Sequence, residues 1–581
     1  MGFNYEALPS GPHIRVLKVK PNPEHALICQ LKVMCLDDDN HDEYTAISYT
    51  WDRTSMESVS TLTFTDGQTM PLSPTLSSLF ETMKNAKPGN DGETGFSVWI
   101  DALCINEADS DERAAQVSMM DRVYSRAACV VVWLGTSDPV TQRAFRFMRS
   151  RRKLRWPNGW PDELSEQDHA GLEMLLRFLA NPWFRRAWVV QEVTLSNNVW
   201  MQCGDDAEGF AIFTRCVWAI WKFFRNWDAY GDEDRAMLGL WSATRLLDIR
   251  ERFIDHSKPL RWDMLLQSAF RWETTDHRDS VFALRGLADR APPIPAPSYT
   301  IPIGQEPEYS EAVEKVYRET AAALLCHGTS LDLLALAGLE RTRSPGLASW
   351  VPDYRHFSFS EPYVVCEAAN WDAGGPLKEQ PQLLSPDRLR IQVYSLDVVE
   401  SVCPECNAYS VLEQQKTMEQ VLKLKDAQQT GASRSDWLDE LAMDLIFGLD
   451  IDEQPAGPEY VKLFHEWLHW LESSTSQSDL SEIKHNAYIR ALEQRVDGWK
   501  AFGTRKGFFC IGPPEIEVGD TLCLVAGCRL PLVLRNINEG EVTSDEFILV
   551  GWCYAAGLMS HGANQQPYAL EHSSTDHVIL T

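Results

Sequence analysis

The sequence predicts an α/β protein, with a doubly wound, mostly parallel sheet at the N-terminal side, then a helical region and a small C-terminal β-rich domain. Three observations lead to this prediction. Between residues 41 and 205, apolar strand-like segments alternate with amphipathic helical segments, which is typical of strand–helix–strand units. Residues 206–345 have mostly helical periodicity. Residues 506–581 contain short apolar segments separated by Gly and Pro, which favour a small barrel or curled sheet.

The same shifts in pattern divide the chain into five segments. Residues 1–40 carry two short strands that pack on the α/β domain, and residues 41–205 form that domain. A helical region covers residues 206–345, a mixed and helical region covers residues 346–505, and the β-rich domain covers residues 506–581. A length of 581 residues is ample for several domains with separate cores.

The first elements follow from side-chain type and turn chemistry. Strands are expected at Ile14–Lys20, Ala26–Met34 and Glu43–Trp51, the last because it is rich in β-branched and aromatic residues. Asp66-Gly67 indicates a hairpin turn. Ser73-Pro74 predicts a helix that runs to Asn85, with Ser as N-cap and Pro at the first helical position.

Two apolar runs of the α/β domain predict strands that are buried on both faces. These runs are Phe96–Cys104 and Cys129–Leu134. A helix is expected between them, from the capping pair Asp109 and Glu112 to Ala127. Helices at Gln142–Arg152 and Ser165–Leu179 and a short strand from Val199 complete the domain.

The second half of the chain has a clearer helical period than strand pattern. A strand is expected at Leu389–Val399. Helices are expected at Ser435–Phe447, Glu459–Leu471 and Leu480–Phe502, before the short strands of the last domain.

Composition narrows the range of partners. With 54 Lys+Arg against 83 Asp+Glu, the formal charge is −29, which disfavours non-specific binding to nucleic acid or anionic membrane. The start of the chain lacks the layout of a secretory signal, and no apolar run approaches the ~18 residues of a membrane span. The 14 Cys are scattered and indicate reduced core residues. We therefore expect a cytoplasmic protein with no membrane span and no nucleic-acid partner.

Two metal-like motifs lack the rest of a site. His465 and His469 form an HExxH pattern on a helix, as in zinc proteases, but Glu472 and Thr475 stand where a third-ligand continuation requires Gly and His. The buried stripe of this helix is expected to be Phe464, Leu468 and Leu471, with both His on the polar side. The CxxC at Cys403–Cys406 has no second pair and is expected to be a loop. No metal site is predicted.

Several common catalytic motifs are missing from the sequence. There is no P-loop, no GxGxxG and no GxSxG nucleophile elbow. Cys104 follows an acidic residue at a strand end, so a thiol hydrolase is conceivable, but no His stands in an informative pattern with it.

Three long segments occur together in a recognisable order: Tyr44–Trp51, Val98–Gly135 and Asn181–Val193. Together they closely resemble the heterokaryon-incompatibility (HET) domain of filamentous fungi. Thr274–Leu287, Ser349–Tyr354 and the patterns near both ends also resemble longer proteins that carry this domain. The chain departs from the family at Asp52, where Gly is usual, and at Glu107, where Gln is usual.

The resemblance implies a role in non-self recognition between fungal cells and in triggering programmed cell death. It also implies a partner, which is an incompatibility protein or the product of an alternative allele, and a homo-oligomer on activation. The HET domain in turn resembles the TIR fold, so the resemblance implies a TIR-like sheet. In TIR enzymes that cleave NAD, an ISY-like strand end and a W-x-x-x-E segment form the site. Ile47-Ser48-Tyr49 and Trp188 to Glu192 match these two patterns.

The chemistry of NAD cleavage agrees with a single carboxylate. Loss of nicotinamide passes through an oxocarbenium-like cation, which a carboxylate beneath the ribose stabilises. The leaving group departs neutral, so no second acid is needed. We assign this catalytic role to Glu192 and expect NAD as substrate, with no cofactor. The expected substrate-binding residues are Tyr49, Trp51 and Trp188 for rings, Arg53 or Arg185 for phosphates, and Asp101 at the sheet edge.

Arg185, Trp188 and Glu192 fall at i, i+3 and i+7, so we expect them on one face of a single helix. This shared face supports their assignment to one site. Structural alternatives stay open. Glu192 could pair with Arg185 or Arg186 on a helix surface, the aromatic residues could be core, and Asp101 could cap a helix. A functional alternative also stays open, in which the HET domain kills without catalysis by acting as a signalling scaffold.

Overall fold

The computed structural model describes residues 3–21, 27–39, 42–51, 60–85, 95–152, 164–224, 234–255, 260–288, 294–339, 344, 346–355, 370–406, 411–428, 434–474, 486–537, 545–559 and 575–581. The chain forms two compact units. Unit 1 comprises Met1–Asp289 and Ala296–Tyr309, and unit 2 comprises Arg290–Pro295 and Ser310–Thr581. Across these described stretches, every helix is too short or too polar to cross a membrane.

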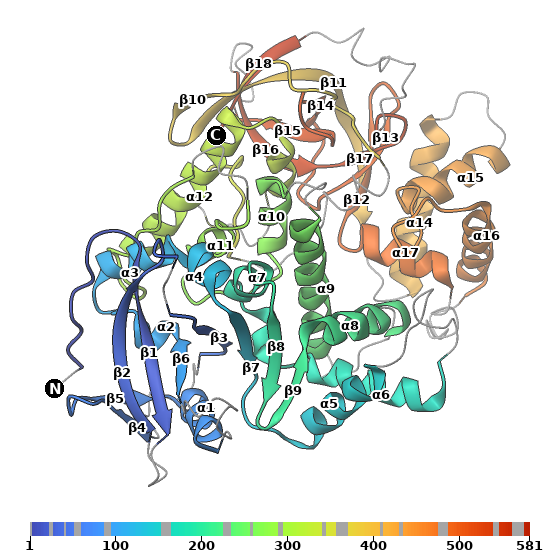
Figure 1. Cartoon of the computed structure of the whole chain (residues 1–581). Coiled ribbons are helices and arrows are strands. Elements are labelled where there is room, and N and C mark those ends of the chain that lie inside the picture. Colours follow the sequence, from blue (N-terminus) through green and yellow to red (C-terminus); the bar gives the residue numbers. More distant parts are fainter. Residues whose placement is uncertain are drawn as a thin grey trace. The chain divides into compact units, whose positions relative to one another are not determined.

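Unit 1 is built on a seven-stranded sheet in the order β2-β1-β6-β3-β7-β8-β9 (Figure 1). Its strands are β1 (His13–Pro21), β2 (Leu27–Cys35), β3 (Thr45–Tyr49), β6 (Phe96–Trp99), β7 (Cys129–Trp133), β8 (Val199–Cys203) and β9 (Asp206–Gly209). The predicted hairpin forms a separate pair, β4 (Ser60–Thr63) and β5 (Thr69–Leu72). The strands predicted near residues 14, 26 and 43 are confirmed to within two residues at each end.

The sheet is mixed, so the prediction of a mostly parallel sheet holds only for its centre. Four adjacent strands, β6-β3-β7-β8, are parallel. On one side β1 pairs antiparallel with β6 and β2 with β1, and on the other β9 pairs antiparallel with β8. Among the parallel strands, β3 comes first in sequence and has β6 on one side and β7 on the other. Such a reversal of strand order leaves a crevice beyond the carboxyl ends of the strands.

The helices of unit 1 connect and cover these strands. They are α1 (Pro74–Asn85), α2 (Asp101–Cys104), α3 (Ser110–Val117), α4 (Met120–Arg126), α5 (Pro139–Arg151), α6 (Glu166–Phe178), η1 (Pro182–Arg185), α7 (Trp188–Thr194), α8 (Phe210–Phe224), α9 (Asp234–Ile254), α10 (Trp262–Ala269) and α11 (Asp279–Phe282). The helix predicted from Ser73-Pro74 is confirmed with both bounds, and the helical middle region is confirmed as well.

The predicted strand Phe96–Cys104 is wrong in its second half. The strand ends at Trp99, and the Ile100 carbonyl accepts hydrogen bonds from the backbone N–H groups of Leu103 and Cys104, at 3.0 and 2.8 Å. These bonds close the helical turn α2. A buried helical turn is as apolar as a buried strand, so hydrophobicity alone does not separate them.

The helix predicted from Asp109 to Ala127 is two helices. Asp109 caps α3 as predicted, since its side chain accepts from the backbone N–H groups of Asp111 and Glu112. The chain then leaves helical geometry at Met119 (φ −114°, ψ 6°), and α4 begins at Met120.

Unit 2 contains a β-rich part and a group of four helices (Figure 1). Its elements are α12 (Glu308–His327), η3 (Asp332–Leu336), β10 (Gln382–Ser385), β11 (Arg388–Glu405), α14 (Val411–Gln428), α15 (Arg434–Leu445), α16 (Pro458–Ser473), α17 (Ala487–Val496), β12 (Lys500–Thr504), β13 (Phe509–Gly512), β14 (Thr521–Leu524), β15 (Leu532–Asn536), β16 (Glu546–Trp552), β17 (Tyr554–Ala555) and β18 (Thr575–Leu580). Strands β14, β15, β16, β18 and β11 form a closed ring, because β11 also pairs with β14. The predicted C-terminal barrel is therefore confirmed.

The helix predicted at Leu480–Phe502 is wrong at its C-terminal end, because Lys500–Thr504 forms strand β12 against β11. Residues 480–485 lie outside the described residues, and from the N-cap Asn486 onward the helix is α17. The turn at Gly498, whose φ is +74°, separates the two elements, because this left-handed conformation ends a helix.

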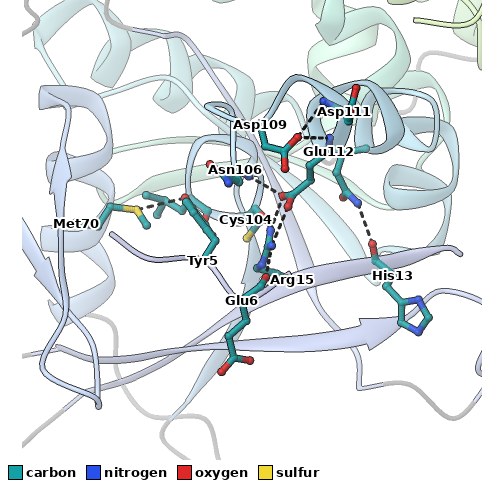
Figure 2. Close-up of polar contacts among 12 residues, drawn as sticks. Tyr5, Glu6, His13, Arg15, Met70, Cys104, Asn106, Asp109, Asp111 and Glu112 are labelled. Atoms are coloured by element: carbon teal, nitrogen blue, oxygen red, sulfur yellow. Dashed lines mark hydrogen bonds and ion pairs between the residues drawn. The ribbon is translucent and has the colours of Figure 1, made fainter. Parts of the chain in front are cut away.

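A buried ion pair ties β1 to helix α3 (Figure 2). The Arg15 guanidinium is 2% exposed; its Nη1 lies 2.5 Å from Oε1 of Glu112, and its Nη2 lies 2.9 Å from Oε2. Arg15 also donates to the Cys104 carbonyl at 3.1 Å, and Glu112 accepts from the Asn106 N–H at 2.8 Å. These charge-assisted bonds hold α2 and the following turn at the edge of the sheet.

Candidate functional site

Three separate segments bring polar side chains to the carboxyl edge of the parallel strands. Ser48 and Tyr49 end β3, Asp101 follows β6, and Glu192 lies on α7. Helix α7 packs on α4 and α9. This arrangement places four residues from distant parts of the sequence within one hydrogen-bonded and electrostatic network, as described next.

Glu192 is deeply buried in this network, with 1% of its surface exposed. Its Oε2 accepts a hydrogen bond from the Ser48 hydroxyl, and Nε1 of Trp183 donates to the same hydroxyl oxygen at 2.8 Å. Tyr124 also bonds the carboxyl group. Burial raises the pKa of Glu192 to about 7, although the Arg186 charge and the bonds from Ser48 and Tyr124 oppose the rise. The group therefore changes charge near neutral pH.

Asp101 connects the buried region around Glu192 to residues that are exposed to solvent. Tyr49 is buried and hydrogen-bonds Asp101, while Nε1 of Trp51 donates to Oδ2 of Asp101 at 3.2 Å. Burial raises the pKa of Tyr49 well above its usual range, so its phenol stays protonated. Trp51 is 39% exposed and Asp101 is partly exposed. The Trp51–Asp101 pair therefore meets solvent.

The predicted helix face of Arg185, Trp188 and Glu192 is wrong. Arg185 ends the short 3-10 helix η1, and α7 begins only at Trp188. Nε of Arg185 pairs with Glu273 at 3.0 Å. The two segments are separated because the Arg186 and Ala187 backbone runs beside Glu273, where the Ala187 N–H donates to the Glu273 carbonyl at 3.1 Å.

The alternative of a surface ion pair for Glu192 is also wrong, because Glu192 is buried and Arg185 pairs with Glu273. Arg186 donates to the Tyr49 carbonyl, so this guanidinium sits close enough to influence the Glu192 charge without pairing with it directly.

A second buried carboxyl group, Asp279, lies beside α7. It accepts from Nε1 of Trp188 at 3.1 Å and from the Tyr299 hydroxyl at 2.6 Å. Burial and the nearby Asp276 charge raise the pKa of Asp279 to about 6, while these two bonds and Arg113 oppose the rise. Trp188 therefore uses its N–H to anchor the start of α7.

Asp276 forms a buried bidentate pair with Arg278. The two side chains are each 2% exposed, with Nε–Oδ1 and Nη2–Oδ2 distances of 2.8 and 2.7 Å. The Arg113 guanidinium lies 3.8 Å from the Tyr299 ring centroid and 3.8 Å from Oδ2 of Asp276. Sequence reasoning did not single out these residues, although Asp276 to Asp279 fall in the segment Thr274–Leu287 that resembles the family. The available signal was three charged residues directly before an apolar run.

Glu107 is an exposed acidic residue in this region. Partial burial and the charges of Asp101 and Asp279 raise its pKa to about 7, against the opposing charge of Arg113. The side chain keeps an exposed surface, so the negative neighbours explain the direction of the shift better than burial does. Glu107 therefore adds a further acid to the network.

The arrangement can hold and release protons near neutral pH at several carboxyl groups. It can also offer an aromatic ring at the surface beside a carboxylate, at Trp51 and Asp101. Arg53, expected to meet phosphates, lies outside the described residues. Cys104 does not suit a nucleophile, because burial raises the pKa of its thiol to about 12 and thiolate is the reactive form.

The zinc-like motif in unit 2 lies on α16. Phe464, Leu468 and Leu471 are buried as predicted, and Nε2 of His465 pairs with Asp439 at 2.7 Å. His469 is exposed. Within the part of the chain that the structure describes, no three His, Cys, Asp or Glu side chains come together as metal ligands. Cys403 belongs to the end of β11 rather than to a loop.

Comparisons with known proteins match one family model to each of the two units. Residues 44–192, which hold β3 to α7, match the family "Heterokaryon incompatibility protein (HET)". Residues 471–566, which hold most of the barrel strands, match the "Het-6 beta-barrel domain". These matches support a heterokaryon incompatibility protein.

One curated relative is "Heterokaryon incompatibility protein 6, OR allele" of Neurospora crassa. It is 22% identical over 669 residues, which cover 96% of this chain and 95% of the relative. No solved structure matches the chain. The resemblance of unit 1 to the TIR fold therefore stays a prediction.

Proposed function

We propose that the protein acts in non-self recognition between fungal cells and that unit 1 triggers cell death by cleaving nicotinamide from NAD, with Glu192 as the catalytic carboxylate. The role in recognition rests on the two family matches and on the relative, whose name describes an incompatibility allele. The proposed partner is an incompatibility protein or the product of another allele, and the proposed location is the cytoplasm.

One observation carries the enzymatic part of this proposal. Tyr49, Trp51, Asp101 and Glu192 come from three segments and meet at the carboxyl edge of the parallel strands, where open α/β sheets bind ligands. Glu192 is the one of these carboxyl groups that is surrounded by protein. A low-dielectric setting makes a carboxylate most effective at stabilising a ribosyl cation. Trp51 offers an exposed ring for stacking.

The burial of Glu192 sets a condition on this mechanism. A ribose reaches the carboxyl group only when the side chains that cover it move, and the carboxyl must ionise, which its raised pKa makes partial at neutral pH. We propose that assembly into a homo-oligomer supplies this change. We propose that the Arg185 guanidinium, which also pairs with Glu273, contacts a phosphate of the substrate. Trp188 is proposed to position α7 through its bond to Asp279 and not to stack on a ring of the substrate.

The test follows nicotinamide release from NAD by the full-length chain, both as purified and after chemical cross-linking into oligomers. Wild type is compared with Glu192→Gln and with Glu208→Gln, a matched control. Glu208 lies on β9 and is fully buried in the same unit, where it pairs with Arg149 and Arg152. We expect release by wild type and Glu208→Gln, and a loss of at least 100-fold in Glu192→Gln. Equal rates in the two variants would contradict the assignment of Glu192.

A non-catalytic scaffold is the second candidate, and the same burial favours it. Under this alternative, the Glu192 carboxyl group, which is 1% exposed and bonded to Ser48 and Tyr124, stabilises the domain and takes no part in catalysis. Under this alternative, no oligomeric form releases nicotinamide, and Glu192→Gln still kills cells in an incompatibility assay if it folds. Under the enzymatic proposal, killing and nicotinamide release are lost together.

A further inference from the structure

We propose that Ser48 and Trp183 are positioning residues that orient the Glu192 carboxyl group and favour its ionised form. They form a chain of two hydrogen bonds, in which Trp183 donates to Ser48 and Ser48 donates to Glu192. The role of this chain in catalysis rests on the proposed function. Its effect on the charge of Glu192 does not, because that charge can be measured without substrate.

The three residues come from distant segments and are all buried. Trp183 lies in η1, Ser48 in β3 and Glu192 in α7, so the two bonds span 135 and 144 positions of the sequence. No more than 1% of any of the three residues is exposed. Buried polar groups take their hydrogen-bond partners from the protein, so the neighbouring side chains decide which way each bond points.

The direction of the two bonds favours a negative charge on Glu192. An indole N–H can only donate, and a hydroxyl group carries a single hydrogen. Nε1 of Trp183 donates to Oγ of Ser48 at 2.8 Å, and the Ser48 hydrogen is directed to Oε2 of Glu192. A hydrogen bond to an ionised carboxylate is about twice as strong as one between neutral groups. The chain therefore stabilises the ionised form more than the neutral form.

Other groups around Glu192 act in both directions. Burial raises its pKa to about 7, and the charge of Asp101 on α2 adds to the rise. The charge of Arg186 and the bonds from Ser48 and from Tyr124 on α4 oppose it. From α9, Arg250 donates to the last carbonyls of α7 and not to the carboxyl group. Because the opposing effects leave the group half ionised near pH 7, the loss of one donor changes its charge at neutral pH.

Unit 1 contains a second chain of the same kind that ends on a neutral atom. Nε1 of Trp133 donates to the Ser78 hydroxyl oxygen at 3.3 Å, and the Ser78 hydroxyl donates to the Thr75 carbonyl at 2.7 Å. Trp133 is buried in β7, and Ser78 lies on α1. The order of the donors is the same, but the last acceptor is a backbone oxygen. Ser78 and Trp133 are therefore matched controls.

The first experiment measures the charge effect without NAD. Urea unfolding of the full-length chain at a series of pH values compares Ser48→Ala and Trp183→Phe with Ser78→Ala and Trp133→Phe. In wild type, stability falls as pH rises from 4.5 to about 7 because the pKa of Glu192 is raised on folding. We expect the fall to extend about one pH unit higher in Ser48→Ala, which loses a charge-assisted bond. Trp183→Phe keeps the Ser48 donor and should shift the range less, and both controls should keep the wild-type range.

The second experiment follows nicotinamide release from NAD by the cross-linked chain over the same pH series. The reaction needs ionised Glu192, so the acidic side of the rate profile should move up by about one pH unit in Ser48→Ala. Its rate should be up to about tenfold lower than wild type on the acidic side and should return to the wild-type level at higher pH. A merely structural role would lower the rate at every pH.

Three results would overturn the proposal: unchanged pH dependence in both Ser48→Ala and Trp183→Phe, equal shifts in the two controls, or a rate that stays low at every pH. If wild type releases no nicotinamide, the proposed function fails, and the unfolding series alone decides the effect on charge. Thermal unfolding checks that each variant folds, and Trp183→Phe keeps the test valid if Ser48→Ala does not.

Discussion

The two units differ in the polar groups that they bury. Unit 1 buries a polar network in which Glu192, Asp276 and Asp279 are all less than a tenth exposed and are hydrogen-bonded. In unit 2, the buried indole N–H of Trp467 has no hydrogen-bond partner among the described residues. Buried polar groups that are hydrogen-bonded favour one arrangement of the chain, whereas a buried N–H without a partner costs stability.

The comparison teaches where to look for function in each unit. In unit 1 the feature is a pair of buried carboxyl groups, because burial raises the pKa of Glu192 to about 7 and that of Asp279 to about 6. In unit 2 the feature is the buried N–H of Trp467, which has no hydrogen-bond partner among the residues that the structure describes. Four predictions test this contrast, beginning with the largest expected effect.

Breaking the buried ion pair of unit 1 should have the largest effect. Arg278→Met leaves the Asp276 carboxylate buried without its main partner, and we expect a loss of about 3–5 kcal/mol in the free energy of unfolding of unit 1. Urea unfolding of the full-length chain measures it.

The double variant Asp276→Leu/Arg278→Met should recover most of this loss, because it removes both charges. Arg177→Met is the control, since its pair with Glu173 is surface-exposed and is worth less than about 1 kcal/mol. If Arg278→Met costs no more stability than Arg177→Met, the buried Asp276–Arg278 pair stabilises unit 1 no more than a surface pair does.

The pH dependence of unit 1 should carry the signature of Glu192. Its pKa is raised from 4.5 to about 7 by burial, so between these values the folded chain binds more protons than the unfolded chain. Stability therefore falls as pH rises from about 4.5 to 7 and is level above that range. For one such group the fall is on the order of 3 kcal/mol.

The measurement compares the unfolding free energy of wild type and Glu192→Gln at a series of pH values. We expect the variant to lose this part of the slope, while Asp279 contributes equally to both. Parallel slopes for the two proteins would show that Glu192 has its ordinary pKa in the folded chain.

Two buried tryptophans form a matched pair across the units. Trp183→Phe removes a bond to Ser48 at 2.8 Å, whereas Trp467→Phe removes an N–H that has no partner among the described residues. Both lose the same indole volume. We therefore expect Trp183→Phe to cost about 1 kcal/mol more than Trp467→Phe in urea unfolding. A larger cost for Trp467→Phe would mean that its N–H is paired in solution.

The smallest effect is expected at the zinc-like motif. His465→Ala removes an exposed pair with Asp439, so stability should change by no more than about 0.5 kcal/mol. Metal analysis of purified wild type and variant should give the same zinc content. A full equivalent of zinc that is lost in the variant would contradict the assignment of these His to the polar face.

Local patterns predicted elements where sequence and burial agree. Ser73-Pro74 marked the start of α1, and the alternation of apolar residues marked Phe464, Leu468 and Leu471 as the buried side of α16. The same reasoning missed α2, because a buried helical turn and a buried strand have the same composition. It also joined Arg185 to α7, since periodicity does not show where a chain leaves the helix.

The candidate site was predictable only in part. Tyr49, Trp51, Asp101 and Glu192 were named from the sequence, and the structure brings them into one network. The resemblance selected them, however, not their spacing. Asp276 and Asp279 were missed because charged residues before an apolar run are usually solvated, whereas here Arg278 pairs with Asp276, and Trp188 and Tyr299 donate to Asp279.

The sequence by itself determined the alternation of strands and helices, the acidic balance, and which side of each regular helix is apolar, because these depend on neighbours within a few residues. Only the tertiary structure decided that the sheet is mixed, that Glu192 is enclosed by Ser48 and Tyr124, and that the Trp467 N–H meets no acceptor among the described residues. The Ser48–Glu192 bond, for example, joins residues 144 positions apart, and local propensity does not encode such a contact.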